Sequence, residues 1–363
     1  DIAYDITKDF LVNGTVRYED YSDFGSATVG KISSRYKFLD DKITLRGSAS
    51  TGFRAPTLHQ IYTQKSQYSF VPGQGIQVSG IVNNVSPQAR QLGIPNLKAE
   101  KSTNYTIGVG AKISKNFNFT IDYYNIKVED RIVLGDKQDG TFPNGDQYTG
   151  LAWFSNSFDS RTTGLDVVAN YNNIELGAGK LGFSLSGNVT FQNERISDVR
   201  AGDSFSRTLE SLMFTSRPET KWILGADYKI GKFGFLLNNT YFGKTTFHQD
   251  GIATFDNTLP STDINPDLNT EFIPKIVTDL GVNFSATSKL TFALNINNIF
   301  NVLPEWKFIA LNADGAALLA DPAQVKNQYN LLTFNGRYSN TTYDGSHFSQ
   351  LGTIWNLSMN YRF

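Results

Sequence analysis

Residues that could react with or coordinate a ligand are few in this chain of 363 residues. It contains no cysteine, which excludes disulfides, thiolate metal sites and cysteine nucleophiles. The three histidines, His59, His248 and His347, are widely separated and lack the spacing of a transition-metal site. A hydrolase would need a serine close to a histidine, and only Ser346 or Ser349 near His347 offers a crude pair. We predict no catalytic residue, no metal site and no cofactor.

Aromatic side chains are better candidates for ligand contacts. Phe, Tyr and Trp make up 13% of the chain, and many stand in long stretches without strand periodicity. Such rings could stack on a ligand at the mouth of a larger structure, or they could pack the loops against one another. The candidate ligand contacts, histidines included, are His59, Tyr62, Tyr68, Phe70, Trp153, Phe154, His248, Trp306 and His347.

Charge and hydropathy narrow the class of protein. Lys and Arg number 33 against 34 Asp and Glu, so the net charge is −1 and nothing points to a nucleic-acid partner. No run approaches the roughly 18 apolar residues of a membrane helix. A transmembrane β-barrel is compatible with the mean hydropathy of −0.30, because lipid-facing and lumen-facing residues alternate along its strands. A soluble all-β protein fits the composition equally well.

The final segment, 355–363, alternates between an apolar and a polar side chain, which indicates a β-strand. Its aromatic carboxyl terminus is typical of the closing strand of an outer-membrane β-barrel, with an edge strand of a soluble sandwich as the alternative. In a barrel, the residues that face lipid are Trp355, Leu357, Met359, Tyr361 and Phe363. Those that face the lumen are Asn356, Ser358, Asn360 and Arg362.

The same period of two recurs in about twelve segments of the chain. The connections between them alternate between tight turns and long stretches, against a hairpin norm of roughly two to five residues. Short turns at one end and long loops at the other are typical of transmembrane barrels. We therefore predict an all-β fold, a transmembrane antiparallel β-barrel. The segments are 11–21, 28–38, 43–53, 105–113, 117–133, 165–171, 181–191, 222–230, 233–241, 276–284, 290–296 and 355–363.

Several short motifs in the chain resemble those of a known family. Gly52-Phe53-Arg54-Ala55-Pro56 is similar to the Gly-Phe-Arg-Ala-Pro box of TonB-dependent outer-membrane receptors. Pro95-Asn96-Leu97-Lys98-Ala99-Glu100 is similar to its Asn-Pro-Asn-Leu-Lys-Pro-Glu segment, with Ile94 where Asn is frequent and Ala99 where Pro is usual. Further matches, in the family's order, are 17–21, 155–157, 161–166 and 297–302.

The resemblance implies a larger protein than this chain. Such receptors have about 22 strands around a plugged lumen, whereas we predict about twelve strands here. We therefore interpret residues 1–363 as the carboxyl-terminal portion of a receptor barrel, with the plug domain outside this chain. An independent small barrel is the alternative. In the first case, the strand near Leu11 should be the outer strand, either unpaired on one side or paired with a segment outside this chain. It should not pair with the strand near Leu357.

The resemblance also implies a function and a location. It predicts a receptor in the outer membrane of a Gram-negative bacterium that binds a scarce nutrient at external loops and imports it with energy supplied through TonB. The nutrient class stays open among siderophores, cobalamin, oligosaccharides and peptides. Position 59 lies where a haem-uptake receptor would carry a ligand histidine, but we favour an ordinary loop histidine at the mouth of the barrel. A passive porin and a barrel hydrolase are the alternative functions.

The partners that the resemblance implies are outer-membrane lipid, the TonB complex acting through a plug, and the small-molecule nutrient. The barrel-assembly machinery would read the terminal strand, in particular Tyr361 and Phe363. The composition of the loops hints at a Bacteroidota-type receptor, which could pair with a lipoprotein lid.

Overall fold

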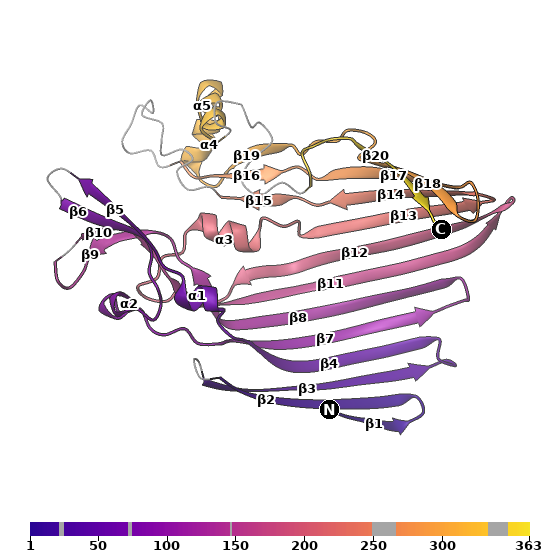
Figure 1. Cartoon of the computed structure of the whole chain (residues 1–363), viewed down its shortest axis with the longest axis horizontal. Coiled ribbons are helices and arrows are strands. Elements are labelled where there is room, and N and C mark those ends of the chain that lie inside the picture. The colour runs from indigo at the N-terminus through magenta and orange to yellow at the C-terminus, as the bar shows by residue number, and fades with distance from the viewer. Residues whose placement is uncertain (22–24, 72–74, 146, 249–265, 333–347) are drawn as a thin grey trace.

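The computed structural model describes residues 1–21, 25–71, 75–145, 147–248, 266–332 and 348–363. Its main feature is one antiparallel sheet of thirteen strands, in which each strand pairs with the next along the sheet (Figure 1). The strands are β1 (Ile2–Thr7), β2 (Phe10–Tyr21), β3 (Gly25–Phe38), β4 (Ile43–Arg54), β7 (Glu100–Lys112), β8 (Phe117–Leu134), β11 (Phe154–Leu176), β12 (Gly179–Arg195), β13 (Thr220–Ile230), β14 (Phe233–Phe242), β17 (Lys275–Ser285), β18 (Leu290–Asn297) and β20 (Ile354–Tyr361).

The twelve predicted segments all lie in this sheet, and the thirteenth strand is β1. Some segments were predicted too short, because β11 has 23 residues where the periodicity predicted 165–171. The neighbouring strands β8 and β12 have 18 and 17 residues. A tilted strand needs only about 9–11 residues to cross a membrane. These three strands therefore extend well beyond a bilayer.

The connections differ at the two ends of the sheet, as predicted. Short turns of two to four residues lie at 8–9, 39–42, 113–116, 177–178, 231–232 and 286–289, all at one end. The long connections, 55–99, 135–153, 196–219, 243–274 and 298–353, lie at the opposite end (Figure 1). We call this second end the loop end.

The long connections contain structure that periodicity did not predict. One small sheet consists of β5 (Lys65–Val71), β6 (Gly75–Ile81), β9 (Gln138–Thr141) and β10 (Gln147–Ala152), and another of β15 (Thr245–Phe247), β16 (Leu268–Phe272) and β19 (Trp306–Ala310). The helices are α1 (Leu58–Tyr62), α2 (Pro87–Gln91), α3 (Arg207–Phe214), α4 (Ala313–Leu319) and α5 (Pro322–Leu332). In the part of the chain that the structure describes, no helix is long and apolar enough to span a membrane.

The main sheet has one apolar and one polar face. In β20 the predicted alternation is confirmed from Trp355 to Tyr361, where apolar residues lie opposite apolar residues of β18 and polar residues opposite small or polar ones. Ile354, the first residue of the strand, lies opposite Asn297. The side chain of Leu357 is 77% exposed, which is favourable only if something apolar covers this face. The apolar cross-strand pairs are Trp355–Ile296, Leu357–Leu294, Met359–Phe292 and Tyr361–Leu290.

On the polar face, an ion pair spans three strands. Nε of Arg46 in β4 donates to Oδ1 of Asp122 in β8 at 2.8 Å. Gly108 of β7 lies between the two residues, opposite both. A Cβ at Gly108 would overlap the Asp122 carboxylate, so only glycine lets the two side chains meet across the strand.

The two outer strands of the sheet are β1 and β20. Among the described residues, β1 pairs only with β2 and β20 only with β18. The strand near Leu357 is therefore not paired with the strand near Leu11, in agreement with the expectation for a partial barrel. The position expected for the outer strand was wrong, however, because the strand that contains Leu11, β2, pairs with both β1 and β3.

Candidate loop-end binding site

The two motifs at the loop end are joined by a salt bridge. Arg54 ends β4 and Glu100 begins β7, directly opposite it in register. Nε and Nη2 of Arg54 donate to the two carboxylate oxygens of Glu100 at 2.7 and 2.5 Å. The backbone N–H of Ile132 in β8 donates to the same carboxylate at 2.7 Å. Glu100 is only 6% exposed, so these three bonds satisfy a buried charge.

The Phe-Arg-Ala-Pro motif also starts the loop that follows it. Pro56 is buried, and Thr57 caps α1. The Thr57 hydroxyl accepts from the Gln60 backbone N–H, while the Gln60 side chain accepts from the Thr57 N–H, which is a complete capping box. Nη1 of Arg54 donates to the same Gln60 side chain at 3.3 Å. The motif thus turns the chain from a strand into a helix.

A buried asparagine that the sequence analysis did not select anchors the second motif. Asn84 is 2% exposed. Its Nδ2 donates to the carbonyl oxygens of Pro95 and Phe154, and its Oδ1 accepts from the Leu97 N–H at 3.1 Å. The Leu97 side chain then packs with Ile61 and Ile132 in a small core. The Pro-Asn-Leu stretch is therefore held by side chains from outside the motif.

Asn156 makes a similar bridge from β11. Its Oδ1 accepts from the Lys98 N–H at 2.9 Å, and its Nδ2 donates to the carbonyl oxygens of Lys98 and Asp130. The residues of the family motifs, Phe53, Arg54, Ala55, Pro56, Pro95, Asn96 and Leu97, thus lie in one hydrogen-bonded junction of β4, β7, β8 and β11 or beside it. The geometry assigns the junction a positioning role for the loops.

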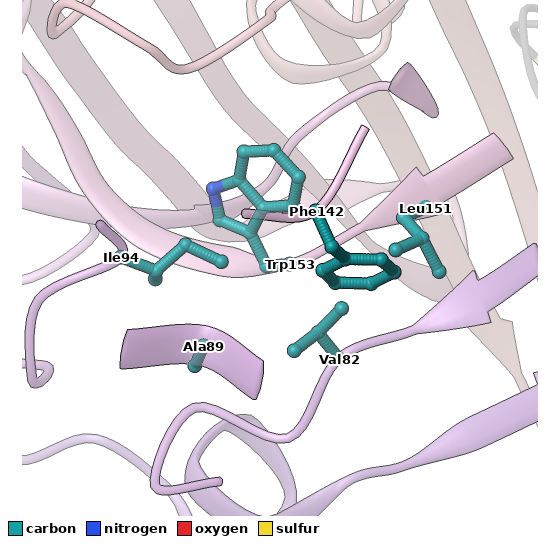
Figure 2. Close-up of a cluster of buried hydrophobic side chains, with 6 residues drawn as sticks. All are labelled: Val82, Ala89, Ile94, Phe142, Leu151 and Trp153. Carbon is teal, nitrogen blue, oxygen red and sulfur yellow. The ribbon is translucent and has the colours of Figure 1, made fainter. Parts of the chain in front are cut away.

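Trp153 packs inside the loops. Its ring is 8% exposed and belongs to a cluster of buried side chains from the two long connections 55–99 and 135–153 (Figure 2). Its Nε1 donates to Oδ1 of Asp203 at 3.2 Å. The aromatic residues could either stack on a ligand or pack the loops against one another, and Trp153 does the second. The cluster consists of Val82, Ala89, Ile94, Phe142, Leu151 and Trp153.

Five other candidates lie around α1 and the sheet of β5, β6, β9 and β10. Tyr68 and Phe70 project from β5 and are 67% and 74% exposed. Tyr62 is half exposed on α1. His59, also exposed on α1, has its ring 6.0 Å from that of Phe154 in an edge-to-face contact. Nδ1 of His59 lies 2.6 Å from the hydroxyl of Thr63.

The remaining candidates belong to the second loop sheet or lie outside the described residues. Trp306 stacks on Tyr329, with ring centroids 5.4 Å apart and an interplanar angle of 12°. His248 is largely buried, with Nδ1 2.9 Å from Oδ1 of Asn269. His347 lies outside the described residues. No group of three potential metal-ligating side chains occurs within the ranges that the structure describes.

Comparison with known proteins identifies related sequences and folds. A family described as TonB dependent receptor-like, beta-barrel, matches residues 2–299. The vitamin B12 transporter BtuB of Photobacterium profundum is 24% identical over 164 residues, which cover 45% of this chain and 21% of that protein.

Solved structures share the fold at low sequence identity. The siderophore receptor PirA from Acinetobacter baumannii superposes with a TM-score of 0.64 at 14% identity, covering 99% of this chain and 44% of that chain. The FrpB iron transporter from Neisseria meningitidis gives a TM-score of 0.58 at 14% identity, with the same coverage. The ferric enterobactin receptor PfeA from Pseudomonas aeruginosa, in complex with enterobactin, gives 0.56 at 16% identity, covering 82% of this chain and 38% of that chain. The chain thus spans less than half the length of these proteins.

Proposed function

Because the chain belongs to the TonB-dependent receptor-like β-barrel family, we propose that it forms part of a receptor that imports a scarce nutrient with energy supplied through TonB. The chain lies in the outer membrane of a Gram-negative bacterium, as members of this family do. These proteins are receptors and transporters and not enzymes, which argues against the hydrolase alternative. The nutrient that we propose is a siderophore, cobalamin, an oligosaccharide or a peptide.

The observation that carries the proposal is the ordered loop end. The salt bridge of Arg54 with Glu100, together with the contacts of Asn84 and Asn156, fixes where the long loops leave the main sheet. Binding residues on loops that a rigid scaffold positions are the usual arrangement of a recognition site. The family whose model matches residues 2–299 consists of receptors and not of passive pores. We therefore favour a receptor over the porin alternative.

We also propose that residues 1–363 are the carboxyl-terminal portion of the receptor barrel. A sheet edge cannot remain unpaired in hydrocarbon, so β1 and β20 each need a further neighbour. Transporters of this type have about 22 strands and a plugged lumen, against the thirteen strands of this sheet. The remaining strands and the plug, which would contact TonB, would lie outside this chain.

Further partners follow from the same proposal. The apolar face would contact outer-membrane lipid, and a lipoprotein lid could cover the loop end. The barrel-assembly machinery would recognise the terminal strand, where the rings of Tyr361 and Phe363 stand edge to face with centroids 5.3 Å apart.

Uptake by the intact receptor tests the proposal. A bacterial strain that depends on this receptor should accumulate labelled nutrient when TonB is present and should lose accumulation when TonB is deleted. Binding at the cell surface should survive the deletion, because only transport needs energy. Equal accumulation with and without TonB would support the porin instead.

A further inference from the structure

A cavity of about 370 Å³ lies between α2 and the sheet of β5, β6, β9 and β10. This volume is in the range of pockets for small-molecule ligands. Its lining combines two aromatic rings and one valine with four amide side chains, and none of the described lining residues carries a charge. The seven residues are Tyr68, Phe142, Val78, Gln88, Gln91, Asn144 and Gln147. We call this cavity the amide pocket.

The floor of the amide pocket belongs to the buried cluster around Trp153, which we call the loop core. Phe142 is buried in the cluster of Figure 2, and its ring centroid lies 4.9 Å from that of Tyr148. In α2, Ala89 is fully buried in the same cluster, while Gln88 and Gln91 are exposed on the pocket side. The Ser86 hydroxyl accepts from the Ala89 N–H and caps the helix. The pocket is therefore largely formed before any ligand enters.

Two lysines and one aspartate of these loops line a different cavity. Lys65 and Gln67 alternate with Tyr68 along β5, so their side chains point away from the amide pocket. They line a separate cavity of about 350 Å³ together with Asp136 and Lys137. Charged side chains are thus present in the same loops, but none belongs to the described lining of the amide pocket.

We infer that the amide pocket binds a neutral, polyhydroxylated ligand of the oligosaccharide class. Each amide offers both a donor and an acceptor, as each hydroxyl of a sugar does, so the two sets can pair without net charge. An exposed ring such as Tyr68 can stack on the apolar face of a sugar ring. An anionic ligand would lose hydration here without gaining a cationic partner, which is unfavourable. The inference narrows the substrate of the receptor proposed above and rests on that proposal.

Binding of glycans to the intact receptor tests this assignment. The purified receptor in detergent is applied to an array of neutral and acidic glycans, and the strongest neutral oligosaccharide is then titrated by calorimetry. Cyanocobalamin and a ferric tris-catecholate serve as the non-glycan probes. We expect a neutral oligosaccharide to bind and both other probes to bind more weakly.

Variants then locate the site. Replacing both Gln88 and Gln91 by Ala should weaken binding about tenfold or more, since the change removes the hydrogen bonds of both amides to the ligand. Tyr68→Ala should weaken it by a similar factor, whereas Tyr68→Phe keeps the ring and should change it little. Gln64→Ala is the matched control, because Gln64 is exposed just before β5 and does not line the pocket. Circular dichroism and the resistance of the loops to protease establish that each variant is folded.

Three results would overturn the inference. The first is an array on which no neutral glycan binds, and the second is a glycan whose affinity the Gln88 and Gln91 substitutions leave unchanged. The third is a charged ferric complex that binds more tightly than any neutral glycan and is weakened by the same substitutions. TonB-dependent uptake of that complex would preserve the proposed function while refuting the neutral pocket, so the two failures are distinguishable.

Discussion

Removal of the Glu100 carboxylate should loosen the loop end without unfolding the sheet. In Glu100→Ala, the Ile132 N–H loses its acceptor in a buried position, and Arg54 loses both of its bonds to the carboxylate. An unsatisfied buried donor costs about 1–3 kcal/mol, and hydrogen bonds to a charged group contribute about 1.5–3 kcal/mol. Arg54 is half exposed and can regain water, so we discount its share. We expect a net loss of about 2–3 kcal/mol in the local opening free energy.

Hydrogen exchange measured by mass spectrometry is the appropriate assay, because it reports local opening in an otherwise folded protein. A loss of about 2–3 kcal/mol corresponds to a roughly 30- to 150-fold fall in protection of the Ile132 amide. Glu175→Ala is the control, since Glu175 pairs with Lys180 at 3.7 Å on the exposed turn between β11 and β12. The control should lower protection of its neighbours less than about threefold, as exposed pairs contribute little. Unchanged protection at Ile132 in Glu100→Ala would refute the anchoring role of the salt bridge.

Three further variants test other parts of the structure. Leu357→Arg should reduce the amount of receptor assembled in the outer membrane far more than Asn360→Arg. The reason is that an arginine facing lipid costs about 2–4 kcal/mol near the bilayer midplane. Equal amounts of the two variants would refute the assignment of Leu357 to the lipid face and Asn360 to the lumen face. Asn84→Ala should expose 83–97 to protease, since it leaves buried backbone groups unpaired at a cost of about 1–3 kcal/mol each; unchanged cleavage would argue against that anchor. Trp153→Ala should destabilise the loop core by about 3–5 kcal/mol while the main sheet stays protected from exchange; loss of protection throughout the sheet would contradict a separate loop core.

The main sheet was predictable because its strands obey a local rule. One face of each strand is apolar and the other polar, so a period of two appears directly in segments such as 43–53 and 355–363. The turns were predictable for the same reason, since they interrupt the period. Strand β1 was not counted among the predicted strands because it has only six residues and precedes the first long alternating segment. The start of β11 was missed because register shifts between Asn156 and Ser160 break the alternation. The end of β11 was missed because a further shift lies between Tyr171 and Ile174.

The loop end was less predictable, because pairing there joins segments far apart in the sequence. β6 pairs with β10 in parallel, so Val78 lies opposite Tyr148 although about seventy residues separate them. No local pattern encodes such a contact. Asn84 carries no signal either, since an asparagine in a polar loop is common and only the fold shows that it is buried. The family motifs did locate the junction, but the bond between Arg54 and Glu100 required the register of β4 and β7.

The loop end of the main sheet should face the outside of the cell, where a nutrient arrives. This chain contains no cysteine, so a cysteine introduced into it can be labelled selectively. Labelling of the unsubstituted receptor gives the background to subtract. A membrane-impermeant maleimide should label Gln64→Cys in intact cells, and it should label Lys232→Cys, in the short turn between β13 and β14, only after the outer membrane is permeabilised. Labelling of Lys232→Cys in intact cells, with Gln64→Cys protected, would contradict the account.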